Sequence, residues 1–249
     1  MLIFKRLVRL ILFIGIAFFI YSYIHKDDLP QEKEIINKMY QEPVQAETER
    51  DQFQVQKKEF TYSITPKYNY ELYGLIVSHY DSENWFDFWH KEDPFNTKDI
   101  CVMWGDNIKT GVYQEMKFSH GEFTCYFDFK NGINSSWYQK FSSTQGSNNH
   151  LLPKDDEVYK AIKQATTGDQ IYLKGYLVDY SIKSPRGQSG TRTTSTIRTD
   201  TGNGACEVVY TTDFQILKKG NTVYQSINQI SKYLIIICVS ILAIFFFKF

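Results

Sequence analysis

Two side chains of this sequence have the chemistry of a nucleophile and its base. Cys206 follows the glycine-rich stretch RTDTGNGA, and His150 follows the polar turn of SNNHLLP. A thiol that converges with a histidine and an acid acts as a nucleophile, because the base accepts its proton. One interpretation is therefore a thiol-dependent hydrolase that uses Cys206 and His150. The other is an unreactive cysteine that leads into a strand, since no local signature of a known cysteine hydrolase surrounds Cys206.

The other cysteines suggest structural roles. Cys101 and Cys125 fall on neighbouring predicted strands, so we expect a disulfide between them in an oxidising compartment. Two reduced, buried thiols are the alternative, and Cys238 belongs to an apolar run near the C-terminus. The patterns HxxxH, HxH and CxxC are all absent from the sequence, so it predicts no metal, and we expect no other cofactor.

The segment NWFDFWHKEDPF concentrates aromatic side chains. Trp85 and Trp89 are at positions i and i+4 with Phe86 beside them, so a short helix would present an apolar stripe. Such a stripe is either a lid packed on the domain or a contact surface for a sugar, peptide or lipid. The candidate binding residues here are Trp85, Phe86 and Trp89.

A second candidate contact surface is the basic stretch IKSPRGQSGTRTTSTIR, which contains no acidic residue. Its basic side chains are Lys183, Arg186, Arg192 and Arg198. Such a loop either contacts phosphate groups or is a solvated hairpin. The charge argues against nucleic acid as a partner, because the whole chain has a formal net charge of zero and residues 60–217 contain 19 acidic and 15 basic residues.

Both ends of the chain contain apolar runs that suit a bilayer. Residues 7–24 read LVRLILFIGIAFFIYSYI, which is long enough for a membrane helix or a signal peptide, and no cleavage site follows. We expect an uncleaved anchor over 1–24 and a second transmembrane helix over 233–249. The second run is short, since residues 233–247 cover only about 22 Å of a roughly 30 Å core, so spanning requires its flanking lysines to snorkel or the bilayer to thin. The basic residues before the first run favour cytoplasmic termini and an extracytoplasmic central domain.

The chain between these runs divides by composition. Residues 25–59 are rich in charge and glutamine and predict a stalk, and residues 218–232 predict a linker. Residues 60–217 contain short aromatic and β-branched runs broken by Gly, Asn and Asp, typical of a β-rich globular domain. One amphipathic helix is predicted between Pro153 and Gly168. Predicted strands are 70–80, 100–104, 112–118, 123–129, 137–142, 171–182, 194–198 and 207–217.

The order of these elements is several strands, one helix and two further long strands, with GDQIYLKGYLVDYS leading from the helix into a strand. This order resembles the oligonucleotide/oligosaccharide-binding (OB) barrel, in which a helix lies between the third and fourth strands. The resemblance covers about Glu71 to Leu217 and leaves Asp81 to Asp99 as an insertion. A small β-sandwich fits the same strand count. The predicted fold class is mainly β with one helix, an OB-like barrel or a small β-sandwich between two transmembrane helices.

The sequence favours a membrane-anchored, non-enzymatic binding or scaffolding protein. Its expected partners are the lipid bilayer and a protein or small ligand that the aromatic stripe contacts. The thiol-dependent hydrolase, and nucleic-acid or phosphate binding through the basic loop, are the alternatives.

Overall fold

A computed structural model describes residues 2–84, 87–88, 90–187, 189–202 and 204–247. The chain forms two compact units. One consists of Met1–Leu29 with Gly220–Phe249, and the other is Pro30–Lys219.

The first unit is a pair of apolar helices, α1 (Leu2–His25) and α4 (Thr222–Phe247). Both are long and apolar enough to cross a membrane. α4 starts earlier than the sequence suggests, because Val223, Ile227 and Ile230 extend its apolar character into the expected linker. Its 25-residue candidate span corresponds to about 37 Å, so the helix is not too short for a bilayer.

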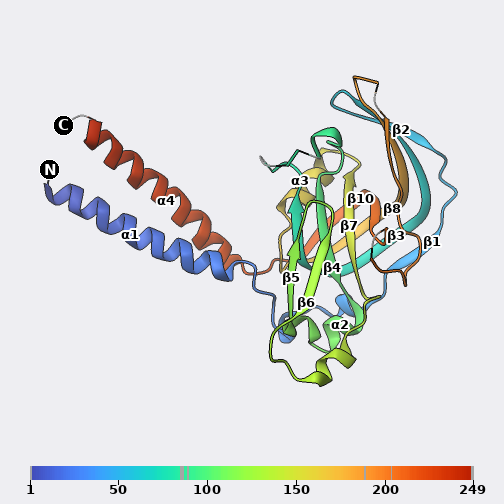
Figure 1. The fold of residues 1–249 in the computed structure, drawn as a ribbon, viewed down its shortest axis with the longest axis horizontal. Coiled ribbons are helices and arrows are strands. Elements are labelled where there is room, and N and C mark those ends of the chain that lie inside the picture. The colour runs from blue at the N-terminus through green and yellow to red at the C-terminus, as the bar shows by residue number, and fades with distance from the viewer. Residues whose placement is uncertain (1, 85–86, 89, 188, 203, 248–249) are drawn as a thin grey trace. The chain divides into compact units, whose positions relative to one another are not determined.

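The two helices lie side by side and antiparallel (Figure 1). Phe4 packs edge-on against Phe245 near one end, with ring centroids 5.7 Å apart. Nearer the other end, Nδ2 of Asn228 lies 3.2 Å from Oγ of Ser22, which is fully buried. Buried small and polar side chains between apolar helices are typical of helix pairs in membranes, where an unpaired polar group is costly.

The second unit is built on a sheet that closes into a ring (Figure 1). Its strands are β3 (Phe60–Asp81), β4 (Lys98–Met103), β7 (Gly146–Pro153), β8 (Gln170–Lys183) and β10 (Glu207–Lys218). β3 pairs with β4, β4 with β7, β7 with β10, β10 with β8, and β8 again with β3. The β7–β10 pair is parallel and the other pairs are antiparallel. The unit is therefore mostly β, as the sequence predicts.

Shorter elements surround this ring. β1 (Val44–Glu47) and β2 (Phe53–Lys57) pair with β3, and β9 (Ser189–Arg192) pairs with β8. β5 (Met116–His120) and β6 (Cys125–Phe129) form a separate hairpin. The helical segments are α2 (Gly105–Lys109), α3 (Asp156–Gln164), η1 (Glu32–Glu34), η2 (Asn37–Tyr40), η3 (His90–Glu92), η4 (Val112–Glu115) and η5 (Ser135–Lys140).

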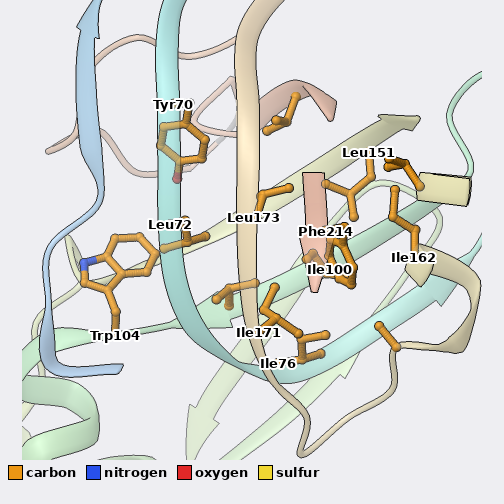
Figure 2. Packing of buried hydrophobic residues seen from close by; sticks show 14 of the residues in the cluster. Tyr70, Leu72, Ile76, Ile100, Trp104, Leu151, Ile162, Ile171, Leu173 and Phe214 are labelled. Atoms are coloured by element: carbon orange, nitrogen blue, oxygen red, sulfur yellow. The ribbon is translucent and has the colours of Figure 1, made fainter. Parts of the chain in front are cut away.

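The main core fills the ring and is covered by α3 (Figure 2). Asp155 caps this helix, since its side chain accepts from the backbone N–H groups of Glu157 and Val158. Val158 and Ile162 then face the core. The helix lies within the range predicted from the sequence. Besides Ile162, the core residues labelled in Figure 2 are Tyr70, Leu72, Ile76, Ile100, Trp104, Leu151, Ile171, Leu173 and Phe214.

The structure differs from the expected stalk over 25–59, because residues from Pro30 onward belong to the β unit. Met39 is fully buried. Nε1 of Trp104 donates to Glu42 at 2.8 Å, and the hydroxyl of Tyr113 donates to the carbonyl oxygen of Pro30 at 2.7 Å. Residues 30–59 bury few apolar side chains. They are held instead by backbone pairing with β3 and by hydrogen bonds from buried side chains to their polar groups.

Three strand predictions also differ from the structure. Residues 137–142 overlap the short helix η5, residues 112–115 of the predicted strand 112–118 form η4, and residues 194–198 contain no strand. Strand β7 was not predicted, because the polar run SNN conceals its alternation.

Candidate functional site

Three strands of the ring place polar side chains on one face. β4 pairs with β7 so that Asp99 lies opposite His150 and Cys101 opposite Asn148. The parallel pairing of β7 with β10 brings Cys206, which immediately precedes β10, beside Asn148. Because side chains alternate between the faces of a strand, all five share the face that points away from the core. The intervening residues belong to the core: Ile100, Val102, Leu151 and Val209.

His150 connects the thiol to a buried carboxylate. Its Nδ1 lies 2.8 Å from Oδ1 of Asp99, and both side chains are buried. The half-buried thiol of Cys206 lies close enough to the imidazole to influence its pKa. The predicted pair of Cys206 and His150 is thus brought together, and Asp99 completes a series of nucleophile, base and acid.

Charge determines the protonation state of His150. Burial lowers the pKa of this imidazole, but the charge of Asp99, together with the polar contacts to Asp99 and Cys206, outweighs burial and raises the pKa to about 9. For Asp99, burial raises the pKa, but the charge and hydrogen bond of His150 outweigh it, so the pKa is lowered. At neutral pH the pair is an imidazolium and a carboxylate.

Asn148 contacts the same sulfur. Its Nδ2 lies 3.6 Å from Sγ of Cys206 and donates to the carbonyl oxygen of Phe123 at 2.9 Å. Nε2 of His120 lies 2.9 Å from Oδ1 of Asn148 and orients the amide. The N–H group that faces the sulfur can stabilise negative charge on the thiolate or on a reacting carbonyl oxygen.

Cys206, His150 and Asn148 line a cavity of about 580 Å³. The β5–β6 hairpin contributes to its wall, and a disulfide between Cys101 and Cys125 ties this hairpin to β4, with Cα atoms 5.7 Å apart. The predicted disulfide is therefore confirmed. The apolar part of the wall includes Met103, Phe123, Tyr126, Phe127 and Phe141.

The turn before β10 sets the position of Cys206. Gly202 and Gly204 have φ angles of +86° and +91°, and residues other than glycine adopt such angles only at a cost in free energy. The N–H group of Ser195 donates to the carbonyl oxygen of Cys206 at 2.9 Å. The turn and the backbone hydrogen bond from Ser195 together place the thiol of Cys206 at the cavity, immediately before β10 begins.

The four basic residues of the loop 183–198 have different surroundings. Lys183 and Arg186 are exposed. Arg198 forms an ion pair with Glu207 and lies 5.1 Å from the ring of Trp104, whereas Arg192 lines the cavity. The proposed phosphate-binding set is thus divided between the surface, an ion pair and the cavity.

The aromatic stripe falls largely on residues whose placement is not described. Trp85, Phe86 and Trp89 all lie outside the described residues. Of the other aromatics in that segment, Phe95 is buried in a core cluster and Phe88 is 71% exposed. The binding role of the stripe stays a prediction.

Sequence reasoning did not identify Asp99 and Asn148 as site residues. The signal was present in KDICVM, where Asp99, Cys101 and Met103 alternate with apolar residues. The run SNNHLL shows no such alternation for Asn148 and His150, because Asn149 between them is also polar. Because the sequence does not predict β7, it does not reveal the pairing of Asp99 with His150.

Comparison with known proteins identifies no relative: no family model, curated protein or solved structure matches this chain. Within the described ranges, no group of three or more His, Cys, Asp or Glu side chains is placed to hold a metal ion.

Proposed function

We propose that the β unit is a thiol-dependent acyl-transfer enzyme or hydrolase with Cys206 as nucleophile. The observation that carries this proposal is the convergence of Cys206, His150 and Asp99 on one face of the ring at the wall of a cavity. The geometry favours this alternative over a purely structural cysteine, because the base has both a thiol and an orienting carboxylate as neighbours.

The proposed reaction has two steps. The thiolate of Cys206 adds to the carbonyl carbon of an ester or thioester, while the amide of Asn148 stabilises the developing oxyanion. The imidazolium of His150 then donates its proton to the leaving group, and the bond between carbonyl carbon and leaving group breaks. Water gives a proton to His150 and adds to the acyl carbon, the bond from this carbon to sulfur breaks, and the acid product leaves the thiolate and the imidazolium restored.

A generic acyl donor tests the proposal. Full-length Cys238→Ser protein in detergent micelles, in which Cys206 is the one free thiol, is mixed with p-nitrophenyl acetate. We expect a burst of p-nitrophenolate and an acetyl group on Cys206, located by mass spectrometry after acid quenching. Cys206→Ser abolishes the burst, and His150→Gln slows it by about a hundredfold or more.

The matched control is His79→Gln. His79 lies 3.2 Å from the hydroxyl of Thr167, and it is not among the cavity-lining residues. Its variant should retain the wild-type burst. Acetylation that is independent of His150, or that modifies a residue other than Cys206, would contradict the proposal.

The proposed enzyme uses an OB-like barrel as its scaffold. Three features support this fold: the ring order β3-β4-β7-β10-β8, the single parallel pair β7–β10, and α3 between β7 and β8. We place this barrel outside the cytoplasm, tethered by α1 and α4, and the disulfide supports an oxidising compartment. The fold by itself does not select the reaction, which rests on the cavity residues.

A further inference from the structure

The wall of the Cys206 cavity contains a cation, Arg192, at the end of β9. The carbon of its guanidinium lies 4.5 Å from the ring centroid of Phe123, so a cation–π contact holds the group against this wall. The positive charge of Arg192 also lowers the pKa of His150, so the two side chains interact electrostatically at the cavity wall.

The guanidinium is incompletely satisfied by the described part of the chain. Its Nη1 atom is buried without a hydrogen-bond partner there. A guanidinium keeps its charge, and a buried donor without an acceptor costs free energy. The acidic residue among the described lining residues, Asp200, instead accepts from the hydroxyl of Ser195 at 2.6 Å.

The cavity size and wall restrict what would satisfy Arg192. A volume of about 580 Å³ suits a small molecule. The aromatic walls, Phe127 and Phe141 among them, suit an apolar body. A planar guanidinium prefers a carboxylate or a similar anion, which it binds through two parallel hydrogen bonds.

We propose that Arg192 is an anion-binding residue of this site and that the substrate is a small acyl compound carrying a carboxylate and an apolar portion. This inference rests on the proposed thiol chemistry and adds its substrate class. Arg192 binds the carboxylate, the aromatic wall contacts the apolar portion, and the reacting carbonyl lies at Cys206.

Two alkylating reagents that differ in charge test the inference. Iodoacetate and iodoacetamide both form a bond from sulfur to carbon and release iodide, but only iodoacetate carries a carboxylate. Rates for Cys206 in full-length Cys238→Ser protein are divided by the rates of glutathione with the same reagents. We expect Arg192→Gln to lower the iodoacetate rate about tenfold or more while the iodoacetamide rate stays within about twofold.

Two further variants make the comparison specific. Arg192→Lys keeps the charge and should retain part of the preference for iodoacetate. Arg186→Gln removes an exposed arginine of the same hairpin and should change neither rate. Where Cys206 reacts with both reagents, an equal effect of Arg192→Gln on the two rates, or no effect on either rate, would overturn the anion site while leaving the thiol proposal intact.

A readout without the thiol separates the two proposals. Phenylacetate is titrated by calorimetry into Cys206→Ser protein with and without Arg192→Gln. Binding that Arg192→Gln weakens about tenfold sustains the anion site even where Cys206 resists both reagents, a result that would refute the thiol chemistry alone. Binding that does not depend on Arg192, or no binding, overturns the anion site.

Discussion

Replacing Asp99 by asparagine isolates the charge that controls His150. In the wild type the pKa of His150 is raised from 6.5 to about 9, although burial opposes this change. At about 1.4 kcal/mol per unit, the difference corresponds to about 3 kcal/mol of preference for the imidazolium. The Asp99→Asn substitution keeps the shape of the side chain and removes its charge, so burial then dominates and the pKa of His150 falls below 6.5.

The same shift predicts how stability depends on pH. A histidine whose pKa is raised on folding stabilises the protein fully below its unfolded pKa of 6.5, and this contribution is lost as the pH rises through about 9. The free energy of unfolding of the wild type should therefore fall by about 3 kcal/mol between about pH 6 and about pH 9 from this residue alone. Asp99→Asn should lack this slope.

Two measurements check the prediction on full-length protein in micelles. NMR of protein labelled at its histidine rings follows the titration, with His150→Gln identifying the resonance. Urea unfolding at several pH values gives the slope. A wild-type His150 that titrates at or below 6.5, or a titration that Asp99→Asn leaves in place, would refute the charge argument.

Three further predictions concern the scaffold and the anchors. Replacing both Cys101 and Cys125 by Ser should lower the free energy of unfolding by about 3 kcal/mol, because the bond closes a separation of 24 residues; reductant should reproduce the loss in the wild type and have no effect on the double variant. Gly175→Ala should lower the free energy of unfolding by about 3 kcal/mol or more, since the new Cβ would lie 2.1 Å from the carbonyl oxygen of Tyr210. As a control, the Cβ added by Gly190→Ala would lie 4.0 Å from the side chain of Ile182, so this variant should unfold at nearly the wild-type temperature. Reporters fused before Met1 and after Phe249 should both signal the cytoplasm, and opposite signals would contradict two spans.

The sequence predicts this fold where hydrophobic pattern alone decides the structure. The long strands β8 and β10 and the helix α3 have strong period-2 or period-3.6 patterns, and they lie close to their expected ranges. The structure of the segment from Pro30 to Glu59 is not predicted by such a pattern. It depends on pairing with β3 and on polar bonds such as the hydrogen bond from Trp104 to Glu42. Tertiary partners of this kind are not visible in local composition.

The candidate site was predictable in part for the same reason. Cys206 and His150 are residue types with conspicuous chemistry, so each was identifiable from the sequence. Asp99 is one of many acidic residues, and only the register of β4 against β7 singles it out. Arg192 was placed in a basic loop, whereas the β8–β9 pairing and the contact with Phe123 assign it to the cavity wall.

The buried charges of this face are difficult to explain by stability. Asp99 is fully buried and His150 nearly so, on strands whose opposite face contributes Ile100, Val102 and Leu151 to the apolar core. Replacing a buried ion pair by well-packed apolar residues is often neutral or stabilising, so an apolar pair at these positions would serve the fold at least as well. Departures from local pattern of this kind are expected at functional sites. The pair lies beside the half-buried Cys206 and a cavity, and a requirement for a charged imidazole at that sulfur accounts for both its burial and its position.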